Sequence, residues 1–384
     1  MLGKVIGEGT YLHIALKDVS EKGAHLLVYG AMEKYFTLNY IADALCDKLK
    51  NNLRPFMLIA LYCVLYAKLP FAVAVKVVTD GLESAGKGAV KGFFTAVMAK
   101  ADRAEYSLPA PGKKGYDEVR YNLPSWLIGL YKKEYGEKYG EVIDNSQKHR
   151  THVVVYCKEE EVLSADPNAE KTSEGYYVKN GKGINDLCAC GKATYMSLGS
   201  ALICKEGGSV AGKKVLDCCA APGGKSVYFA KRGAFVTACD VHGHRVKLID
   251  SYAKRMGVNV EAVLCDGTKR KDGYVDGFDL VLCDVPCSGL GVIDKKRDIV
   301  LNRTYEDILS LASLQAEILE NCSAYVKRGG TLLYSTCTVF SKENGDVVDG
   351  FLTKHDDFVE ETRVQYLPDG KGMEGFFVCR MRRS

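Results

Sequence analysis

Two cysteines in the second half of the sequence lie in short motifs that could support nucleophilic chemistry. Cys287 belongs to Asp284-Val-Pro-Cys-Ser-Gly289, and Cys337 belongs to Tyr334-Ser-Thr-Cys-Thr338. Each motif ends a predicted strand, so both thiols are expected at one crevice above a sheet. A thiolate that adds to carbon-6 of a pyrimidine makes carbon-5 nucleophilic enough to attack an electrophilic methyl group. An acid at the Watson–Crick edge, for which Asp284 is placed, would stabilise the charge that develops on the ring.

A glycine turn upstream has the form of a cofactor site. The turn Cys219-Ala-Ala-Pro-Gly-Gly-Lys225 follows a short apolar step that ends in Asp217. A strand that ends in such a turn and opens a helix leaves unpaired backbone N–H groups at the sheet edge. Asp240 has the position from which a carboxylate accepts hydrogen bonds from ribose hydroxyls. The turn and this acid indicate a nucleoside cofactor, without separating NAD from S-adenosylmethionine.

An NAD-dependent oxidoreductase is the weaker of these two hypotheses. The turn lacks the GxGxxG pattern of dinucleotide-binding folds, and no second nucleotide-binding half is recognised in the sequence. The two cysteine motifs favour a methyl donor directed at a pyrimidine.

The elements that must position these residues alternate as in an α/β domain. Strands are expected at Lys214–Asp217, Phe235–Asp240, Val260–Cys265, Phe278–Asp284 and Thr331–Ser335, with a last pair near Phe358–Val359 and Gly375–Arg382. Helices are expected at Ser226–Lys231, His244–Met256, Tyr305–Val326 and Lys342–Lys354. Four strands end at or next to an acid, namely Asp217, Asp240, Asp266 and Asp284. Carboxylates at the carboxyl ends of parallel strands line the crevice where such sheets bind ligands.

The N-terminal part has apolar residues at helical spacing and no residues with a catalytic pattern. Four segments are expected: a helical domain at 1–103, a linker with a short helix at 104–150, a small segment at 151–204, and the α/β domain at 205–384. His152–Tyr156 is predicted as a strand, and residues 158–190 are polar and give no clear period.

The charge of the chain is weakly basic and unevenly distributed. The net charge is +4 over 384 residues; positions 1–150 hold 21 basic and 16 acidic residues, and the remainder holds 31 and 32. A basic N-terminal part suits an anionic partner such as RNA. A merely solvated surface fits the charge equally well.

The cysteines and apolar runs indicate a cytoplasmic, reduced protein. The 15 cysteines are odd in number and spread along the chain, and none has zinc-site spacing, so no metal is expected. Cysteines other than Cys287 and Cys337, Cys218 included, are interpreted as structural. The start Met1–Glu8 has no signal-peptide pattern, and the longest apolar run, Phe56–Ala67, is too short for a membrane span. A monomer is expected.

The motifs together closely resemble the Nop/Sun family of RNA cytosine-5 methyltransferases. The resemblance covers about residues 196–384 and rests on Cys219–Lys225, Asp240, Asp266-Gly267, Asp284–Gly291, and Ser335–Thr338 with Glu343-Asn344. Positions 1–140 look like the helical NusB-like extension of the RsmB type, in the stretches Leu26–Gly30, Leu61–Tyr66, Lys91–Val97 and Glu134–Gly136. The resemblance implies a NusB-like helical domain followed by a Rossmann-like domain. It also implies S-adenosylmethionine as cofactor and a cytosine of 16S ribosomal RNA as substrate.

Roles for individual residues follow from this resemblance alone. It implies that Cys337 is the nucleophile that attacks carbon-6. It also implies that Cys287 assists release of the methylated RNA, either as the base that removes the carbon-5 proton or by acting through that base. It assigns S-adenosylmethionine binding to Cys219, Ala220, Ala221, Pro222, Gly223, Gly224, Lys225, Asp240, Asp266 and Asp284. Two roles stay open for Lys225: contact with the methionine carboxylate or with the target base.

Three departures from the family pattern concern the substrate more than the chemistry. They are His152–Tyr156 in place of an Arg-Val-Asn type of strand, Met196-Ser197 in place of a Gln-Asp-like pair, and Lys296-Arg297-Asp298 without the usual Pro. Methylation of tRNA, another RNA or DNA therefore stays an alternative, although cytosine-5 DNA enzymes use Pro-Cys as nucleophile. A non-catalytic RNA-binding or antitermination-like factor is a further alternative, against which both cysteines and all four acids argue.

Overall fold

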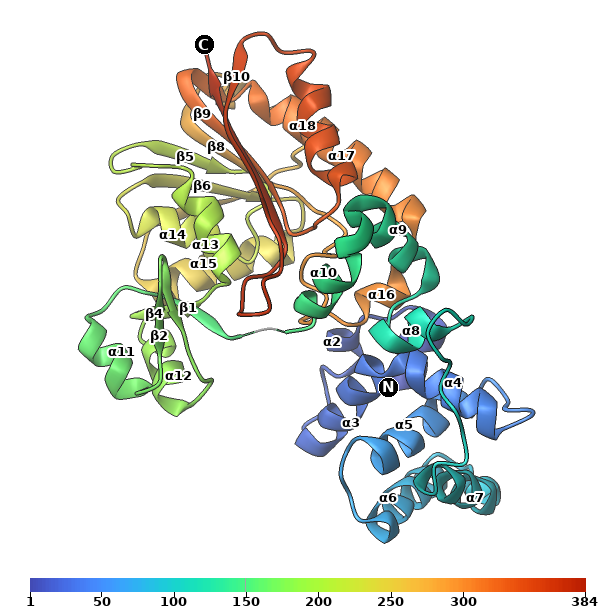
Figure 1. Ribbon diagram of the computed structural model, residues 1–384. Coiled ribbons are helices and arrows are strands. Elements are labelled where there is room, and N and C mark those ends of the chain that lie inside the picture. Colours follow the sequence, from blue (N-terminus) through green and yellow to red (C-terminus); the bar gives the residue numbers. More distant parts are fainter. Residues whose placement is uncertain (149) are drawn as a thin grey trace. The chain divides into compact units, whose positions relative to one another are not determined.

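The structure is a computed structural model that describes residues 1–148 and 150–384. The chain divides into two compact units. The first unit comprises residues 1–139 and 296–303, and the second comprises residues 140–295 and 304–384. Figure 1 gives the element labels used below.

The first unit is helical. Its elements are α1 (Leu2–Glu8), α2 (Leu12–Ala15), α3 (Lys22–Glu33), α4 (Tyr35–Leu45), α5 (Arg54–Leu65), α6 (Phe71–Ser84), α7 (Lys91–Asp102), α8 (Tyr116–Tyr121), α9 (Ser125–Tyr135) and α16 (Ile299–Asn302), with the 3-10 helices η1 (Gly88–Val90) and η2 (Gly136–Lys138).

Helix α5 forms the core of this unit. Met57, Leu58 and Leu61 are fully buried, and α5 packs against α3, α4, α6 and α7. A helix that is apolar over most of its circumference needs neighbours on several sides. Pro55 lies in the first turn of α5, where the missing N–H breaks no helical hydrogen bond.

A segment from far along the chain completes the helical unit. The Asp298 carboxylate accepts the backbone N–H of Leu12 at 2.8 Å, and Leu301 packs against the apolar core. Residues 296–303 therefore belong to this unit by packing, although they lie in the sequence between two motifs of the α/β domain.

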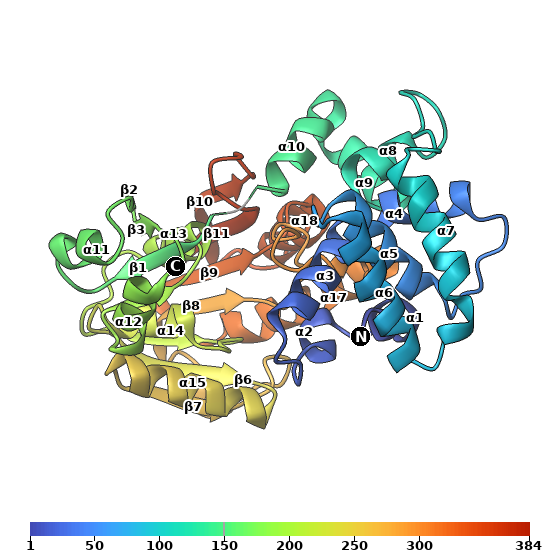
Figure 2. The same cartoon turned by 90° about the horizontal axis from the view of Figure 1, so that it is seen from below.

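The second unit contains a small antiparallel sheet. Its elements are β1 (His152–Val155), β2 (Glu170–Thr172), β3 (Gly175–Tyr177), β4 (Ala193–Tyr195), α11 (Glu159–Ala165) and α12 (Lys182–Ala189), with strand order β2-β3-β1-β4. Figures 1 and 2 show both helices beside this sheet. Residues 158–190, which gave no clear period, thus contain two helices and a hairpin. Strands of three residues are too short for a sequence period to reveal.

The large sheet has seven strands in the order β10-β11-β9-β8-β5-β6-β7. The strands are β5 (Lys214–Asp217), β6 (Phe235–Asp240), β7 (Val260–Leu264), β8 (Phe278–Asp284), β9 (Val326–Thr336), β10 (Phe358–Tyr366) and β11 (Phe376–Arg383). The helices of this region are α10 (Tyr139–Ser146), α13 (Leu198–Lys205), α14 (Gly224–Ala230), α15 (Gly243–Met256), α17 (Tyr305–Ser323) and α18 (Gly345–Leu352), with η3 (Asp272–Tyr274) and η4 (Ser341–Glu343).

Helices cover both faces of this sheet. One apolar cluster joins α13, α14 and α15 to strand residues such as Val215 and Leu280, and another joins α17 and α18 to their strand neighbours Leu216 and Val281. Successive strand residues thus point to opposite faces, and both faces are buried, as in doubly wound folds. Figure 1 shows α17 and α18 side by side.

The predicted fold class, a helical N-terminal region followed by a Rossmann-like domain, is confirmed. Strands β5, β6 and β8 have the predicted bounds, whereas β9 begins at Val326 and β10 continues to Tyr366, beyond the segments predicted. The predicted helix at Tyr305–Val326 ends at Ser323, because β9 begins three residues later. Among the helices of the described residues, none combines the length and apolarity needed to cross a membrane.

Candidate active site

The carboxyl ends of β9, β8, β5, β6 and β7 form one edge of the parallel sheet, and the predicted site residues lie along it. Asp284 pairs with Ser335 in the register of β8 and β9, and Cys337 follows two residues later. Asp217 ends β5, and Asp240 ends β6. The edge therefore brings together side chains that are distant in the sequence.

The predicted cofactor turn connects β5 to α14. Gly223 has φ +107°, in the left-handed region, where glycine avoids the strain that a side chain would cause. A Cβ on Gly223 would lie 3.3 Å from the Cα of Ile249, so the turn also packs closely on α15. The backbone N–H of Ala220 donates to the carbonyl of Cys239 at 2.8 Å, which fixes the turn to β6.

Asp217 lies beneath this turn and is buried. Ser226, in the first turn of α14, donates its hydroxyl to the Asp217 carboxylate at 2.7 Å. Burial raises the pKa of Asp217 to about 7, although the Ser226 hydrogen bond opposes this shift. Asp217 therefore anchors the start of α14 to the end of β5.

Asp240 and Asp266 lie at neighbouring strand ends on the far side of β5 from the cysteines. The Asp240 carboxylate accepts the backbone N–H of His242 at 3.0 Å and pairs with Arg245 at 3.3 Å. The Asp266 carboxylate accepts the hydroxyl and the N–H of Thr268, which lower the pKa of Asp266. Both carboxylates are thus held in fixed orientations.

Lys225 and Asp284 form an ion pair across the edge. The Lys225 Nζ lies 2.6 Å from the Asp284 Oδ2, and the Ser335 hydroxyl donates to the Asp284 Oδ1 at 2.8 Å. Burial alone would lower the pKa of Lys225, but the Asp284 carboxylate raises it above its ordinary value. Lys225 therefore connects the glycine turn directly to the acid at the end of β8.

Cys287 and Cys337 lie side by side. Their Sγ atoms are 3.1 Å apart, and the backbone N–H of Cys337 lies 3.3 Å from the Cys287 sulfur. The hydrogen bond to Cys337, together with burial, raises the pKa of the Cys287 thiol. At this distance the two thiols form one coupled pair rather than two independent groups.

Two glycines and a buried carboxylate hold the cysteine loops, and the sequence reasoning gave them no role. The N–H of Gly291 donates to the carbonyl of Cys337 at 2.9 Å, and the N–H of Gly375 donates to the carbonyl of Gly291 at 2.8 Å. The Glu343 side chain accepts hydrogen bonds from Ser288, next to Cys287. The sequence motif already contained the Glu343-Asn344 pair. The sequence alone could not show that Ser288 is the hydrogen-bond partner of Glu343.

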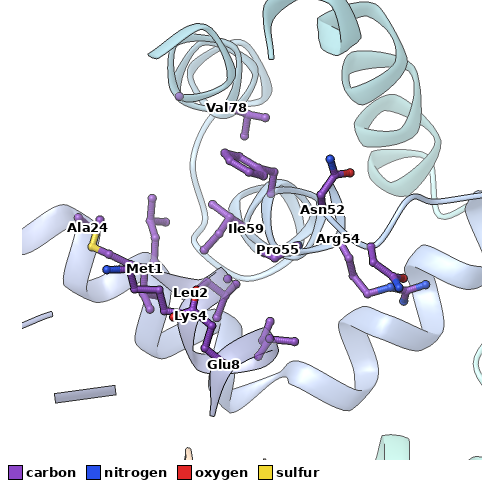
Figure 3. A pocket seen from close by; sticks show the side chains of 18 of the residues that line it. Met1, Leu2, Lys4, Glu8, Ala24, Asn52, Arg54, Pro55, Ile59 and Val78 are labelled. Atoms are coloured by element: carbon purple, nitrogen blue, oxygen red, sulfur yellow. The ribbon is translucent and has the colours of Figure 1, made fainter. Parts of the chain in front are cut away.

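Two further features are a group of three cysteines in the α/β domain and a cavity in the helical unit. Within the described residues, the Sγ atoms of Cys218, Cys283 and Cys322 lie within 4.8 Å of one another, and all three residues are buried. A cavity of about 840 Å³ in the helical unit is lined by α1, α3, α5 and α6, including Leu2 and Ile59 (Figure 3). The strand-end acids, Cys287 and Cys337 are not among the residues that line it.

The family model and the relatives that this chain resembles all carry names of small-subunit ribosomal RNA methyltransferases. Residues 208–382 match the family model described as 16S rRNA methyltransferase RsmB/F. A "Probable ribosomal RNA small subunit methyltransferase B" of Bacillus subtilis (strain 168) is 28% identical, over 93% of this chain and 89% of the relative. The "Ribosomal RNA small subunit methyltransferase B" of Vibrio cholerae serotype O1 is 28% identical, over 93% of this chain and 88% of the relative.

Solved structures share the fold. The crystal structure of PH0851 superposes with a TM-score of 0.83 at 23% identity, covering 100% of this chain and 97% of that chain. NSun6 from Pyrococcus horikoshii superposes with a TM-score of 0.61 at 18% identity, covering 68% of this chain and 98% of that chain.

Proposed function

We propose that this chain, whose residues 208–382 match the family model described as 16S rRNA methyltransferase RsmB/F, transfers a methyl group from S-adenosylmethionine to carbon-5 of a cytosine in small-subunit ribosomal RNA. The observation that carries the proposal is the pair of thiols, 3.1 Å apart, at the same sheet edge as the Lys225–Asp284 ion pair. Carbon-5 methylation needs a thiol nucleophile and an acid for the ring, and this edge holds both.

The residues around the glycine turn fit the cofactor chemically. The carboxylates of Asp240 and Asp266 are suited to the ribose hydroxyls and the base of a nucleoside, and Gly223 provides the left-handed backbone of the turn that opens α14. The segment Cys219–Lys225 with Asp240, Asp266 and Asp284 would hold it. When bound, S-adenosylmethionine supplies an electrophilic methyl group.

Cys337 acts as the nucleophile. Its thiolate forms a bond to carbon-6 of the cytosine, and the ring electrons move to carbon-5, which becomes nucleophilic. The hydrogen bond to Cys337 and burial raise the pKa of the Cys287 thiol. After methylation, loss of the carbon-5 proton expels the Cys337 thiolate and restores the aromatic ring. Cys287 assists this release, as the base or through it.

Asp284 and its partner Lys225 together stabilise the cytosine ring while it carries charge: the Lys225 ammonium supplies positive charge, and the Asp284 carboxylate accepts a hydrogen bond from the amino group of the cytosine. Lys225 and Ser335 each bind one of its carboxylate oxygens, so the acid has a fixed orientation before the base arrives. Of the two roles left open for Lys225, the ion pair supports the one at the target cytosine, where Lys225 would orient Asp284. It gives less support to binding of the methionine carboxylate.

The proposed substrate class is RNA. We also propose that the protein is a monomer and that it is cytoplasmic, the compartment in which it would meet ribosomal RNA. Residues 1–150 carry the basic surplus of the chain, with 21 basic against 16 acidic residues, which suits a phosphate backbone. The expected absence of a bound metal is part of the proposal, because thiol chemistry at carbon-6 needs none.

The test is incubation of the protein with S-adenosylmethionine and small-subunit ribosomal RNA, followed by mass spectrometry of the nucleosides. We expect 5-methylcytosine at one position. If 5-methylcytosine formed only on transfer RNA, transfer RNA would be the substrate instead of ribosomal RNA. No 5-methylcytosine, together with no S-adenosylmethionine binding by calorimetry, would support the non-catalytic RNA-binding factor instead.

A further inference from the structure

The carboxylate of Glu343 joins the loops that carry the two cysteines. Glu343 is fully buried in η4, six residues after Cys337. Its Oε1 accepts the backbone N–H of Ser288 at 2.8 Å, and its Oε2 accepts the Ser288 hydroxyl at 2.6 Å. Ser288 directly follows Cys287, so both oxygens of this carboxylate bind the residue next to the second thiol.

Gln315 of α17 extends the same connection to the other side of Cys287. Its Nε2 donates to the Glu343 Oε1 at 3.0 Å and to the carbonyl of Pro286 at 2.9 Å. The Tyr334 hydroxyl donates to the backbone carbonyl of Glu343 at 2.6 Å and so holds η4 itself. Ser288 is therefore bound to the buried carboxylate directly, and Pro286 is connected to it through Gln315.

The charge of Glu343 calls for an explanation beyond packing. A carboxylate is costly to bury, and here its side-chain partners are the neutral donors of Ser288 and Gln315. A neutral side chain could fill the same space without that cost. Because the Glu343 carboxylate binds both the N–H and the hydroxyl of Ser288, its negative charge lies beside Cys287. This charge opposes the formation of a thiolate on Cys287, an effect that a neutral group lacks.

We propose that Glu343 is a positioning residue that seats Cys287 against Cys337 and reserves the role of nucleophile for Cys337. The inference rests on the proposed function, because it concerns the choice between the two cysteines of that reaction. The titratable groups that face Cys287 are Cys337 from the loop after β9, Glu343 from η4 and Tyr334 from β9. After the Cys337 hydrogen bond and burial, the charge of Glu343 adds to the rise in the pKa of Cys287.

The test compares how fast the two thiols react, without any RNA. The protein is treated with a limiting amount of iodoacetamide at neutral pH, and mass spectrometry gives the ratio of alkylated Cys337 to alkylated Cys287. We expect Cys337 to dominate in the wild-type protein. Glu343→Gln should lower the ratio about ten-fold, the effect of about one pKa unit, and Glu343→Asp should keep part of the preference.

Two further variants separate charge, position and stability. Ser288→Ala removes one hydrogen bond and keeps the charge, so it should change the ratio less than Glu343→Gln. Asp279→Asn removes a carboxylate that pairs with Lys327 at the opposite end of β8, and it should leave the ratio unchanged. Circular dichroism checks folding, and if Glu343→Gln does not fold, Glu343→Asp and Ser288→Ala carry the test.

A wild-type ratio in a folded Glu343→Gln protein would overturn the inference. Methylation rates give the second readout: Glu343→Gln should lower kcat and leave the KM for RNA nearly unchanged. If the wild-type protein makes no 5-methylcytosine but shows the expected ratios, the proposed function fails while the control of thiol reactivity by Glu343 stands.

Discussion

The sulfur atoms of Cys287 and Cys337 lie 3.1 Å apart, although 50 positions separate the two residues in the sequence. Two thiolates at this distance would repel each other, so the pair loses its first proton more easily than its second. The hydrogen bond to Cys337 and burial raise the pKa of the Cys287 thiol. We propose that Cys337 is the nucleophile of this pair and that Cys287 assists release.

Replacement of Cys287 by Ala should trap the reaction after methyl transfer. The nucleophile Cys337 remains, but the thiol that assists release is gone, so a covalent protein–RNA adduct should accumulate and appear as a shifted band on a denaturing gel. Cys190→Ala, a change at an exposed cysteine, is the matched control and should show no adduct. Normal turnover by Cys287→Ala would remove its proposed role in release.

Lys225 and Asp284 should behave as a single unit in catalysis. Asp284→Asn is expected to lower the single-turnover methylation rate by about 10²–10³, the range for loss of one group that stabilises developing charge. Because Lys225 holds this carboxylate at 2.6 Å, the double variant with Lys225→Met should be little slower than Asp284→Asn alone. Additive losses in a double-mutant cycle would mean that Lys225 acts independently.

Substitution at Gly291 should disturb the cysteine loops through packing. A Cβ there would lie 2.1 Å from the carbonyl oxygen of Gly375 and 2.8 Å from that of Cys337. Gly291→Ala should therefore destabilise the protein by about 1–3 kcal/mol and lower the midpoint of thermal unfolding. Gly350→Ala, in α18 where a Cβ meets open space, is the control, and equal midpoints for the two variants would contradict the packing argument.

The stability of the protein should depend on pH through Asp217. Its pKa is about 7 in the folded protein and about 4 in an unfolded chain, so the folded state binds the proton more tightly. The resulting stabilisation is complete below about pH 4 and is lost as pH rises through 7, on the order of 4 kcal/mol at most.

Asp217→Asn removes this dependence, because an amide does not titrate in this range. The thermal midpoint of the variant relative to wild type should therefore rise between pH 5 and pH 8. Parallel curves for the two proteins over this range would show that the pKa of Asp217 is not raised by folding.

The strands that position the site could be predicted because their signals are local. β5, β6 and β8 are short apolar runs that end in an acid, and the bounds of all three agree with those predicted. The hydrogen bonds of Glu343 to Ser288 and Gln315 span 55 and 28 positions, and no local pattern reports them. Residues 296–303 likewise join the helical unit through contacts such as Asp298 with Leu12.

Attack of Cys337 on carbon-6 of cytosine can be shown by trapping the covalent bond that it forms. An RNA substrate with 5-fluorocytosine at the target position cannot release the enzyme, because the fluorine at carbon-5 takes the place of the proton that must leave. Digestion of the trapped complex and mass spectrometry then identify the attached residue. We expect the nucleotide on Cys337, and no trapped complex with Cys337→Ala. Attachment at Cys287, or unchanged trapping by Cys337→Ala, would contradict attack by Cys337.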